Sequence, residues 1–315
     1  MAGTADMNTQ TIGRFAPSPT GPLHFGSLIA ALGSWLSARA VGGRWHLRID
    51  DLDPDRSIAC MADTIELQLE AFGLTWDGPI LFQSERIDAY VAALEQLQTA
   101  GVVYRCTCTR REIGARAHYG PLGAIYAGTC RNGPTHPERD AALRLRLSPG
   151  QHEVIDRIQG TWSIDADRIG DVIVRRRNGV TAYHLATTVD DAFLGVTDIV
   201  RGSDLLPAAV IQEELQRRLN LPAPGWAHLP VMMTPDGTDK LSKQTGAPAV
   251  DPAHDPVTPL IDAWCFLGQP PPPEAPATPA EFLTWALARW DESRIPPGER
   301  LVAGGPGGGL RREGT

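Results

Sequence analysis

A loop rich in proline and glycine, Ala16–Gly26, separates a short stretch with strand character, Ile12–Phe15, from a segment with helical periodicity. The loop therefore joins the carboxyl end of a predicted strand to the amino end of a predicted helix. In an open α/β sheet a ligand binds at this place, because the first N–H groups of the helix have no partner within it. Further strand and helix patterns alternate up to about residue 105, which favours a parallel sheet covered by helices.

Two segments of this sequence could bind a nucleotide. In the first loop, Gly26 lets the backbone approach a nucleotide closely, and His24 can donate a hydrogen bond to a phosphate oxygen. A second segment, Lys-Leu-Ser-Lys-Gln at 240–244, places Lys240 and Lys243 on a predicted loop, where they can neutralise charge that develops on a triphosphate. Taken alone, the first pattern is more often an ordinary turn and the second a solvated surface, so neither decides the function.

Together, the two segments resemble the signatures of the class I aminoacyl-tRNA synthetases. His24-Phe-Gly-Ser27 resembles the HIGH signature, and Lys240-Leu-Ser-Lys-Gln244 resembles the KMSKS signature in matching order and context. The longer string Arg14-Phe-Ala-Pro-Ser-Pro-Thr-Gly21 is more specific and resembles the glutamyl and glutaminyl subgroup, as does Arg48-Ile-Asp-Asp-Leu-Asp-Pro54. The resemblance extends from Ile12 to about Pro252.

The sequence departs from these signatures at several positions. Ser27 replaces the last histidine of HIGH, while Leu241 and Gln244 replace the methionine and the last serine of KMSKS. Asp50 stands where a glutamate is common, and because it is one methylene shorter it reaches a substrate amine either directly or through a water. Ser27 keeps a hydrogen-bond donor and both lysines are present, so the departures leave the family assignment in place.

The resemblance implies an α/β fold, a Rossmann-like class I synthetase catalytic domain with an inserted zinc-binding lobe and a short helical C-terminal region. The insertion is indicated by a stretch rich in glycine, proline, cysteine and tyrosine that interrupts the alternation of strands and helices. We expect a flexible start at 1–11, the first half of the catalytic domain at 12–105, the insertion at 106–139, the second half with the lysine loop at 140–250, the helical region at 251–303 and a disordered tail at 304–315.

Glutamate recognition requires cations for the carboxylates and an acceptor for the ammonium, and arginine suits a carboxylate because its planar fork binds both oxygens. Outside a family context, such residues are more often surface ion pairs or buried hydroxyls. By resemblance, Arg14 and Arg201 bind the side-chain carboxylate, Asp50 binds the amino group, and Ala16, Ser18 and Tyr183 lie beside the substrate. The resemblance also implies catalytic roles for His24, Lys240 and Lys243, and binding of ATP, with Mg²⁺, by His24, Gly26, Ser27 and Lys243.

Three of the five cysteines, Cys106, Cys108 and Cys130, fall close together. The odd total argues against a disulfide framework. A Cys-x-Cys pair with a third cysteine a short loop away fits a structural zinc site with one ligand still to be found, and His118 and His136 are chemically suitable fourth ligands. The alternative is three buried, inert cysteines.

The cysteine segment also resembles the zinc lobe of one branch of the family, the glutamyl-Q tRNA(Asp) synthetases. In that branch the tyrosine of a Tyr-x-x-x-Cys sequence completes the site, which implies one structural Zn²⁺ bound by Cys106, Cys108, Tyr126 and Cys130. Only about seventy residues follow Lys243, which is too few for an anticodon-binding domain of ordinary size with its linker and favours the same branch.

This branch implies a ligase that converts glutamate and ATP to glutamyl-adenylate without tRNA and then transfers the glutamate to queuosine in the anticodon of tRNA(Asp). A truncated glutamyl-tRNA synthetase, which would charge the tRNA 3′ end, is one alternative. A non-catalytic paralogue that keeps the fold is another, although the presence of His24, Lys240, Lys243, Arg14 and Arg201 counts against it.

The formal net charge of −8 does not indicate a nucleic-acid binder from bulk electrostatics. Arg110–Arg111 and Arg175–Arg177 are basic clusters that either contact RNA phosphates or are solvated ends of elements. No apolar run is long enough to span a bilayer, and Met1–Thr11 lacks the pattern of a signal peptide. We expect a monomer in the cytoplasm, without a membrane partner.

Overall fold

The structure is a computed structural model that describes residues 10–115, 118–233, 249–298 and 300–302. Most of the predicted flexible start and tail lies outside these ranges, and so do Lys240 and Lys243. Within the described part of the chain, no helix is both long enough and apolar enough to cross a membrane.

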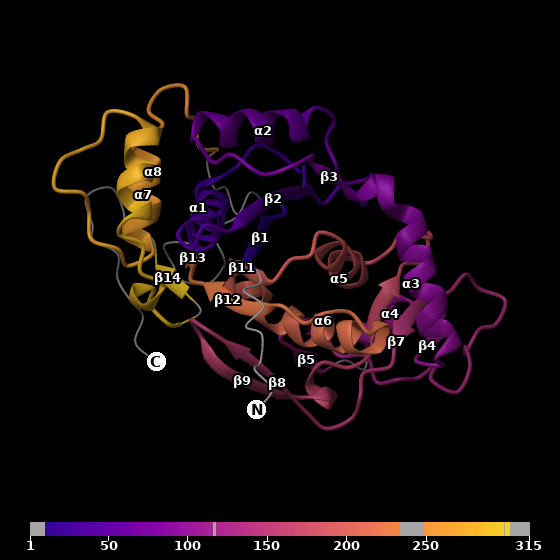
Figure 1. Cartoon of the computed structure of the whole chain (residues 1–315). Coiled ribbons are helices and arrows are strands. Elements are labelled where there is room, and N and C mark those ends of the chain that lie inside the picture. Colours follow the sequence, from indigo (N-terminus) through magenta and orange to yellow (C-terminus); the bar gives the residue numbers. More distant parts are fainter. Residues whose placement is uncertain (1–9, 116–117, 234–248, 299, 303–315) are drawn as a thin grey trace, which may run out of the picture.

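A parallel three-stranded sheet forms the first part of the fold (Figure 1). Its strands are β1 (Ile12–Phe15), β2 (Arg44–Ile49) and β3 (Leu81–Phe82), in that order. Helix α1 (Phe25–Arg39) connects β1 to β2, and α2 (Met61–Ala71) lies in the connection between β2 and β3. The predicted strand, loop and helix at the start of the chain are therefore confirmed.

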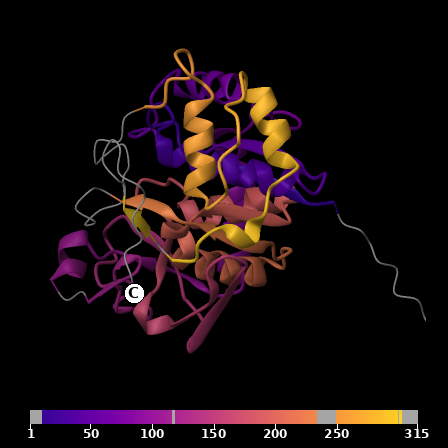
Figure 2. The ribbon, with the colours of Figure 1, turned by 90° about the vertical axis from the view of Figure 1, so that its left-hand side faces the viewer.

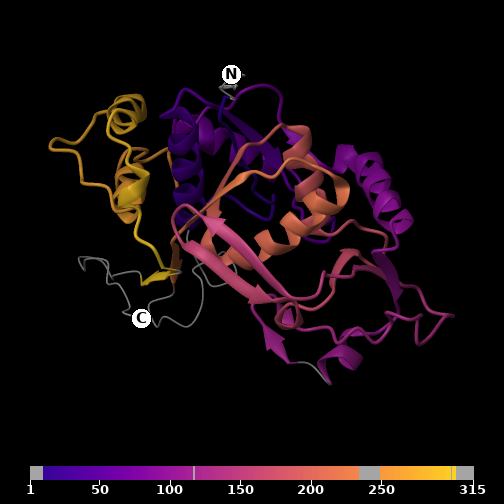
Figure 3. The ribbon, with the colours of Figure 1, turned by 60° about the horizontal axis from the view of Figure 1, so that its bottom comes forward.

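A second, four-stranded sheet continues the α/β pattern. Strands β11 (Asp198–Gly202), β12 (Gly225–Leu229) and β8 (Gln151–Asp156) are parallel neighbours, and β9 (Gly160–Asp165) forms an antiparallel hairpin with β8. Helix α6 (Leu206–Leu219) connects β11 to β12. Figure 3 shows the β8–β9 hairpin extending beyond the helices.

The two sheets meet along β1 and β11. The amide of Thr197 donates to the carbonyl of Ile12 at 2.9 Å, and the amide of Ile12 donates to the hydroxyl of Thr197 at 2.9 Å. Helix α5 (Tyr183–Phe193) precedes β11 along the chain and lies beside this junction (Figure 1). The carboxyl ends of β1 and β11 therefore lie together, as they do at the switch point of an open α/β sheet.

An antiparallel sheet and a small lobe interrupt the α/β pattern after α3. Strand β7 pairs with both β4 and β10, and the cysteine-rich segment lies between β4 and β7 along the chain. The elements are α3 (Ile87–Thr99), β4 (Val103–Cys106), α4 (Arg110–Gly114), β5 (Tyr119–Gly120), β6 (Gly123–Ala124), β7 (Ala142–Leu145) and β10 (Val172–Arg175).

The C-terminal elements pack against α1. Helices α7 (Thr258–Phe266) and α8 (Pro279–Leu287) stand next to one another at one side of the molecule (Figure 2). Trp264 of α7 is fully buried in the same apolar core as α1, and its indole N–H donates to the carbonyl of Pro270 at 2.7 Å. Strand β14 (Arg300–Val302) pairs in parallel with β13 (Val231–Met233).

Two apolar cores support the fold. The first surrounds α1, β1, β2 and α2, and the second lies among α3, α5, α6 and the strands β7 to β10. Four single-turn 3-10 helices complete the described elements: η1 (Gln83–Arg86), η2 (Ala166–Arg168), η3 (Ser203–Leu205) and η5 (Glu292–Arg294).

Candidate active site

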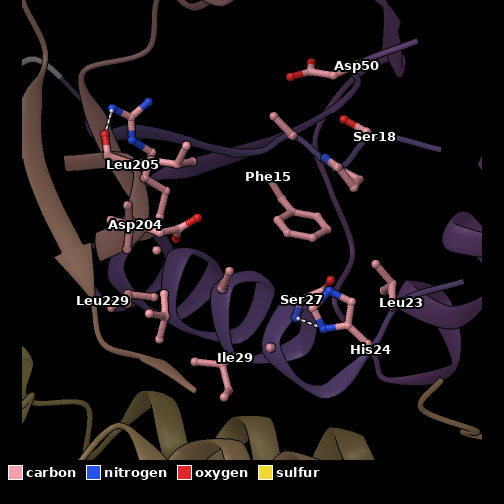
Figure 4. Close-up of a pocket in the computed structure, with 18 of the residues that line it drawn as sticks. Phe15, Ser18, Leu23, His24, Ser27, Ile29, Asp50, Asp204, Leu205 and Leu229 are labelled. Carbon is pink, nitrogen blue, oxygen red and sulfur yellow. Dashed lines mark hydrogen bonds between the residues drawn. The ribbon is translucent and has the colours of Figure 1, made fainter. Parts of the chain in front are cut away.

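A cavity of about 530 Å³ opens where β1 and β11 end and α1 begins (Figure 4). Its wall includes the residues that follow β1 and the last residues of β11. All predicted glutamate-binding and ATP-binding residues within the described chain line this one cavity: Arg14, Ala16, Ser18, His24, Gly26, Ser27, Asp50, Tyr183 and Arg201. Lys240 and Lys243 lie outside the described residues.

The amino end of α1 faces the cavity through His24. The backbone of His24 is extended, and its Nδ1 accepts a hydrogen bond from the amide of Ser27 at 3.3 Å, so His24 caps the helix. A neutral His24 therefore carries its ring proton on Nε2. In Figure 4, His24 and Ser27 lie on the other side of the Phe15 ring from Ser18 and Asp50. This end of the cavity suits an anion, because the helix dipole and the first N–H groups favour negative charge there.

The chain that follows the lysine segment returns to His24. The amide of Val250 donates to the carbonyl of Leu23 at 2.9 Å, and Ala249 forms a β-bridge with His24. Gln68 of α2 fixes this junction, since it accepts from the amide of Leu23 at 2.7 Å and donates to the carbonyl of Val250 at 2.8 Å. The described chain therefore resumes, at Ala249 and Val250, beside the HIGH-like segment.

Four buried charges form a continuous network beside the cavity. Oδ1 of Asp191 accepts from Nε of Arg14 at 3.1 Å and from Nη1 of Arg48 at 2.6 Å. Nε of Arg48 also donates to Oδ1 of Asp50 at 2.6 Å. Two arginines and two aspartates balance one another, so the network holds two cations in the interior without a net charge.

The two aspartates of this network differ in acidity because they have different numbers of cationic partners. Burial raises the pKa of Asp50 to about 6, and its single partner, Arg48, only partly offsets this. Burial acts on Asp191 in the same direction, but Arg14 and Arg48 together hold the pKa of Asp191 below its usual value. Asp191 is therefore firmly ionised, whereas the charge of Asp50 responds to mildly acidic pH.

Arg201 is a buried cation whose hydrogen-bond partners are all neutral groups. Its Nη1 donates to Oε1 of Gln212 at 2.7 Å and contacts the hydroxyl of Tyr183 at 3.5 Å, and its Nη2 donates to the carbonyl of Leu205 at 3.1 Å. Its Nε donates to Nε2 of His228 at 3.0 Å. Among the described residues no carboxylate forms an ion pair with Arg201, and burial lowers the pKa of its guanidinium. The cavity therefore contains a guanidinium that no described carboxylate pairs with directly, although Asp191 and Asp204 attract it from a longer distance.

The arginine carried by β1 approaches the same place. Val200 is the residue before Arg201, and its carbonyl accepts a hydrogen bond from Nη1 of Arg14 at 3.4 Å. Arg14 and Arg201, separated by most of the catalytic region in sequence, thus lie on one wall of the cavity. Sequence analysis assigned no role to Asp191 or Arg48. The signal for Asp191 was available, because α5 contains two adjacent aspartates, Asp190 and Asp191, and no other charged residue except the histidine His184.

The predicted metal ligands form a compact cluster away from this cavity. The sulfur atoms of Cys106, Cys108 and Cys130 all lie within 4.8 Å of one another. The hydroxyl of Tyr126 accepts from the amide of Cys130 at 2.8 Å and lies 3.5 Å from the sulfur of Cys108. Burial opposes ionisation of Cys130, but hydrogen bonds, first from Tyr126 and then from the backbone of Thr135, lower its pKa to about 5. The cluster thus favours a thiolate.

Neither histidine considered as a fourth ligand belongs to this cluster. His136 is half-buried, and its ring nitrogens lie 3.6 Å from Glu138 and 3.9 Å from Glu112. His118 is exposed. Tyr126 is buried, and the guanidinium of Arg144 stacks 3.9 Å from the centre of its ring, so its position is fixed by the protein. Of the predicted fourth ligands, the structure brings Tyr126 to the cysteines.

Several arginines that were considered as phosphate contacts bind the protein itself. Arg176 forms an ion pair with Asp53 at 2.7 Å, and Arg177 donates to the carbonyls of Thr107 and Cys108, each at 2.9 Å. Arg110 and Arg111 are exposed on α4.

Comparison with known proteins places these sites in a family context. A sequence model of the family described as tRNA synthetases class I (E and Q), catalytic domain, matches residues 10–277. The chain is 48% identical over 298 residues to the glutamyl-Q tRNA(Asp) synthetase of Ectopseudomonas mendocina, covering 94% of this chain and 98% of that protein. It is also 48% identical over 287 residues to the glutamyl-Q tRNA(Asp) synthetase of Chromobacterium violaceum, covering 91% and 95%.

Solved structures of similar fold agree. A glutamate tRNA ligase from Elizabethkingia meningosepticum, crystallised in complex with its amino acid, has a TM-score of 0.73 and 25% sequence identity, and covers 92% of this chain and 67% of its own. Glutamate-tRNA synthetase from Elizabethkingia anophelis has a TM-score of 0.74 at the same identity, covering 92% and 68%.

Proposed function

Because the chain belongs to the glutamyl-Q tRNA(Asp) synthetases, a branch of the class I glutamyl and glutaminyl tRNA synthetases, we propose that it activates glutamate with ATP and transfers it to queuosine in the anticodon of tRNA(Asp). The observation that carries the proposal is the buried guanidinium of Arg201, which forms no ion pair among the described residues, in the cavity that also contains Arg14 and the His24 end of α1. A glutamate side chain supplies the missing negative charge, and glutamine does not.

The glutamate pocket follows from this charge distribution. Arg201 and Arg14 bind the side-chain carboxylate, and the hydroxyl of Tyr183, already in contact with Arg201, donates to it. Asp50 lies on the opposite part of the wall, with Ser18 beside it in Figure 4, and its carboxylate binds the ammonium group of glutamate. Ala16 leaves room for the aliphatic chain between these two ends.

The first reaction needs positioning and charge stabilisation more than covalent help from the protein. The α-carboxylate of glutamate attacks the α-phosphorus of ATP, which is bound as its Mg²⁺ complex, and pyrophosphate leaves. Nε2–H of His24 and the N–H groups near Gly26 and Ser27 donate to phosphate oxygens at the amino end of α1. We assign Lys240 and Lys243 to the leaving pyrophosphate, because they belong to the KMSKS-like signature and the chain that follows them resumes at Ala249 beside His24.

In the second reaction a hydroxyl of the queuosine ring attacks the adenylate carbonyl and AMP leaves. Anticodon bases are single-stranded and can turn outward into a pocket, as RNA recognition commonly requires. Arg110 and Arg111, exposed on the cysteine-rich lobe, are the arginines we assign to phosphate contacts. We propose that the protein acts as a monomer in the cytoplasm. Transfer to a tRNA 3′ end is the alternative, consistent with the resemblance to the Elizabethkingia ligases.

We further propose that the cluster Cys106, Cys108, Tyr126 and Cys130 binds one structural Zn²⁺. With Zn–S bonds of about 2.3 Å, sulfurs at the corners of a tetrahedron lie about 3.8 Å apart, and the sulfurs of Cys108 and Cys130 lie 3.5 Å apart. The donor set therefore fits the ion. Four protein ligands leave no open position, so the metal stabilises the lobe and takes no part in the reaction.

The proposed glutamate pocket predicts selective ATP–pyrophosphate exchange. Glutamate and ATP alone should give exchange without tRNA, and glutamine or aspartate should be used about a hundredfold less efficiently, because glutamine brings no carboxylate to pair with the buried Arg201. The measurement is kcat/KM for each amino acid. Equal use of glutamine would refute the pocket, and absence of exchange with glutamate would refute the function.

The acceptor is tested by mapping the labelled RNA. We expect transfer of labelled glutamate to queuosine-containing tRNA(Asp) and none to the same tRNA without queuosine. Nuclease digestion then assigns the label to a fragment. Label on the anticodon fragment supports the proposal, whereas label on the 3′-terminal adenosine would favour an ordinary glutamyl-tRNA synthetase.

The pKa of Asp50, raised to about 6, predicts a pH dependence of glutamate binding. A proton on Asp50 removes the charge that attracts the ammonium, so KM for glutamate should be constant above pH 6 and rise about tenfold for each pH unit below it. Asp50→Asn should raise KM and abolish this inflection, while Asp50→Glu, which keeps the carboxylate, should retain one. A wild-type KM that is flat from pH 5 to 8 would contradict the role of Asp50.

The metal site predicts about one zinc per chain in protein purified without chelators, measured by elemental analysis. Tyr126→Phe should weaken zinc retention in competition with a chelator, because it removes one of four ligands. His118→Ala and His136→Ala are matched controls that should retain the metal. Loss of zinc in a histidine variant but not in Tyr126→Phe would show that the fourth ligand is wrong, and a metal-free, fully active wild type would exclude the site.

A further inference from the structure

Behind the cavity, a line of buried hydrogen bonds leads from Asp156 through His228 to Arg201. Oδ2 of Asp156 lies 2.6 Å from Nδ1 of His228, and Nε2 of His228 lies 3.0 Å from Nε of Arg201. The side chains of Asp156 and His228 are both 0% exposed. The three residues come from neighbouring parallel strands, β8, β12 and β11. Asp156 and His228 do not line the cavity themselves.

The donors and acceptors of this line assign the tautomer of His228. An arginine side chain has donors only, so Nε2 of His228 accepts the bond from Arg201 and carries no proton. The ring proton is therefore on Nδ1, where it faces the carboxylate of Asp156. Burial lowers the pKa of His228 to about 4 although Asp156 opposes this, so the neutral ring is the form present at neutral pH.

We propose that Asp156 and His228 are positioning residues for Arg201, which hold its guanidinium in the orientation that receives the substrate carboxylate. The inference rests on the proposed glutamate pocket and adds to it the residues that orient its main cation. With Nε fixed by His228, Nη1 by Gln212 and Nη2 by Leu205, the guanidinium is restrained on all three of its nitrogens. The N–H groups of Arg201 that these bonds do not use are then held in fixed directions.

A neutral histidine has an advantage over a carboxylate in this place. A carboxylate on Nε of Arg201 would neutralise the guanidinium and compete with the carboxylate of the substrate. His228 accepts the hydrogen bond without contributing charge, and the ionised Asp156 is kept one imidazole ring further away. The arrangement therefore orients Arg201 and leaves its charge available. The ring of Trp226, 4.9 Å from the Arg201 guanidinium and stacked along His228, limits movement of both.

Asp156→Asn tests the tautomer directly. Oδ1 of Asp156 also accepts from the amides of Ile158 at 2.9 Å and Gln159 at 2.8 Å, so the amide oxygen of asparagine is retained on that side. The amide nitrogen then faces Nδ1 of His228 and donates to it, which moves the ring proton to Nε2, against the donor of Arg201. We expect KM for glutamate to rise about ten- to a hundredfold with KM for ATP and the thermal unfolding midpoint little changed.

His228→Gln provides the matched background. Its side-chain oxygen can accept from Nε of Arg201 whatever residue 156 is, so adding Asp156→Asn to His228→Gln should cause no further rise in KM for glutamate. If Asp156 merely supports the turn at Ile158, its replacement raises KM by the same factor in both backgrounds, and that result would overturn the proposal.

A measurement on the wild-type protein is independent of how the variants fold. The ¹⁵N chemical shifts of the His228 ring, assigned by their loss in His228→Gln, should show a protonated Nδ1 and an unprotonated Nε2 at neutral pH. A protonated Nε2 in the wild type would exclude the proposed positioning. ATP–pyrophosphate exchange by the wild type with glutamate separates failure of the proposed function from failure of the positioning proposal. No exchange contradicts the proposed function. An active wild type together with an unaltered KM in Asp156→Asn contradicts only the role of Asp156.

Discussion

The carboxylate of Asp191 holds the wall of the cavity together. It accepts hydrogen bonds from Arg14 of β1 and Arg48 of β2, and it belongs to α5, which comes more than 140 residues later in the chain. Without such a partner the two neighbouring buried arginines would destabilise the fold, because an unpaired buried charge costs several kcal/mol. The neighbouring Asp190 connects α5 to the segment of η1 and α3, because its carboxylate accepts hydrogen bonds from Gln83, Arg86 and Tyr90. Two consecutive residues of α5 thus bind β1 and β2 on one side and the η1–α3 region on the other.

The distribution of charge follows from how these partners are shared. Asp191 and Asp50 compensate Arg14 and Arg48, and no described carboxylate is left to pair with Arg201. The protein binds Arg201 with an amide oxygen, a backbone carbonyl and an imidazole instead. These acceptors satisfy the hydrogen bonds of a buried guanidinium but not its charge. An anionic substrate group completes the balance, so the selectivity for charge is built into the apoprotein.

Short sequence segments, together with the family resemblance, were sufficient to predict a set of residues that line the cavity. The glycine- and proline-rich loop, the helix start at His24 and the segment around Asp50 are each short and continuous, and a strand–loop–helix unit determines its own ligand-facing side. The cysteine cluster was also predictable, because its members lie close in sequence. Tyr126 was selected over two histidines by family resemblance, and only packing shows why: the Tyr126 hydroxyl lies at Cys108 and Cys130, whereas His118 is exposed and the His136 ring lies by Glu112 and Glu138.

The residues that sequence analysis missed are those whose role depends on a partner far away in the sequence. Asp191 is 177 residues from Arg14, and His228 is 72 residues from Asp156, so no spacing or periodicity links them. The phosphate surface predicted at Arg175–Arg177 stays a prediction, since all three arginines are exposed. Arg176 and Arg177 also form ties within the protein, which a basic cluster in sequence does not reveal.

Those ties connect the cysteine cluster to the glutamate pocket. Arg177 donates to the carbonyls of Thr107 and Cys108, at the backbone that carries the first cysteines, while Arg176 pairs with Asp53, three residues after Asp50. The turn that bears both arginines leads directly into α5, which begins at Tyr183. One short turn therefore contacts the backbone of the cysteine lobe and the loop that follows Asp50, and continues into the helix that carries Tyr183 beside Arg201.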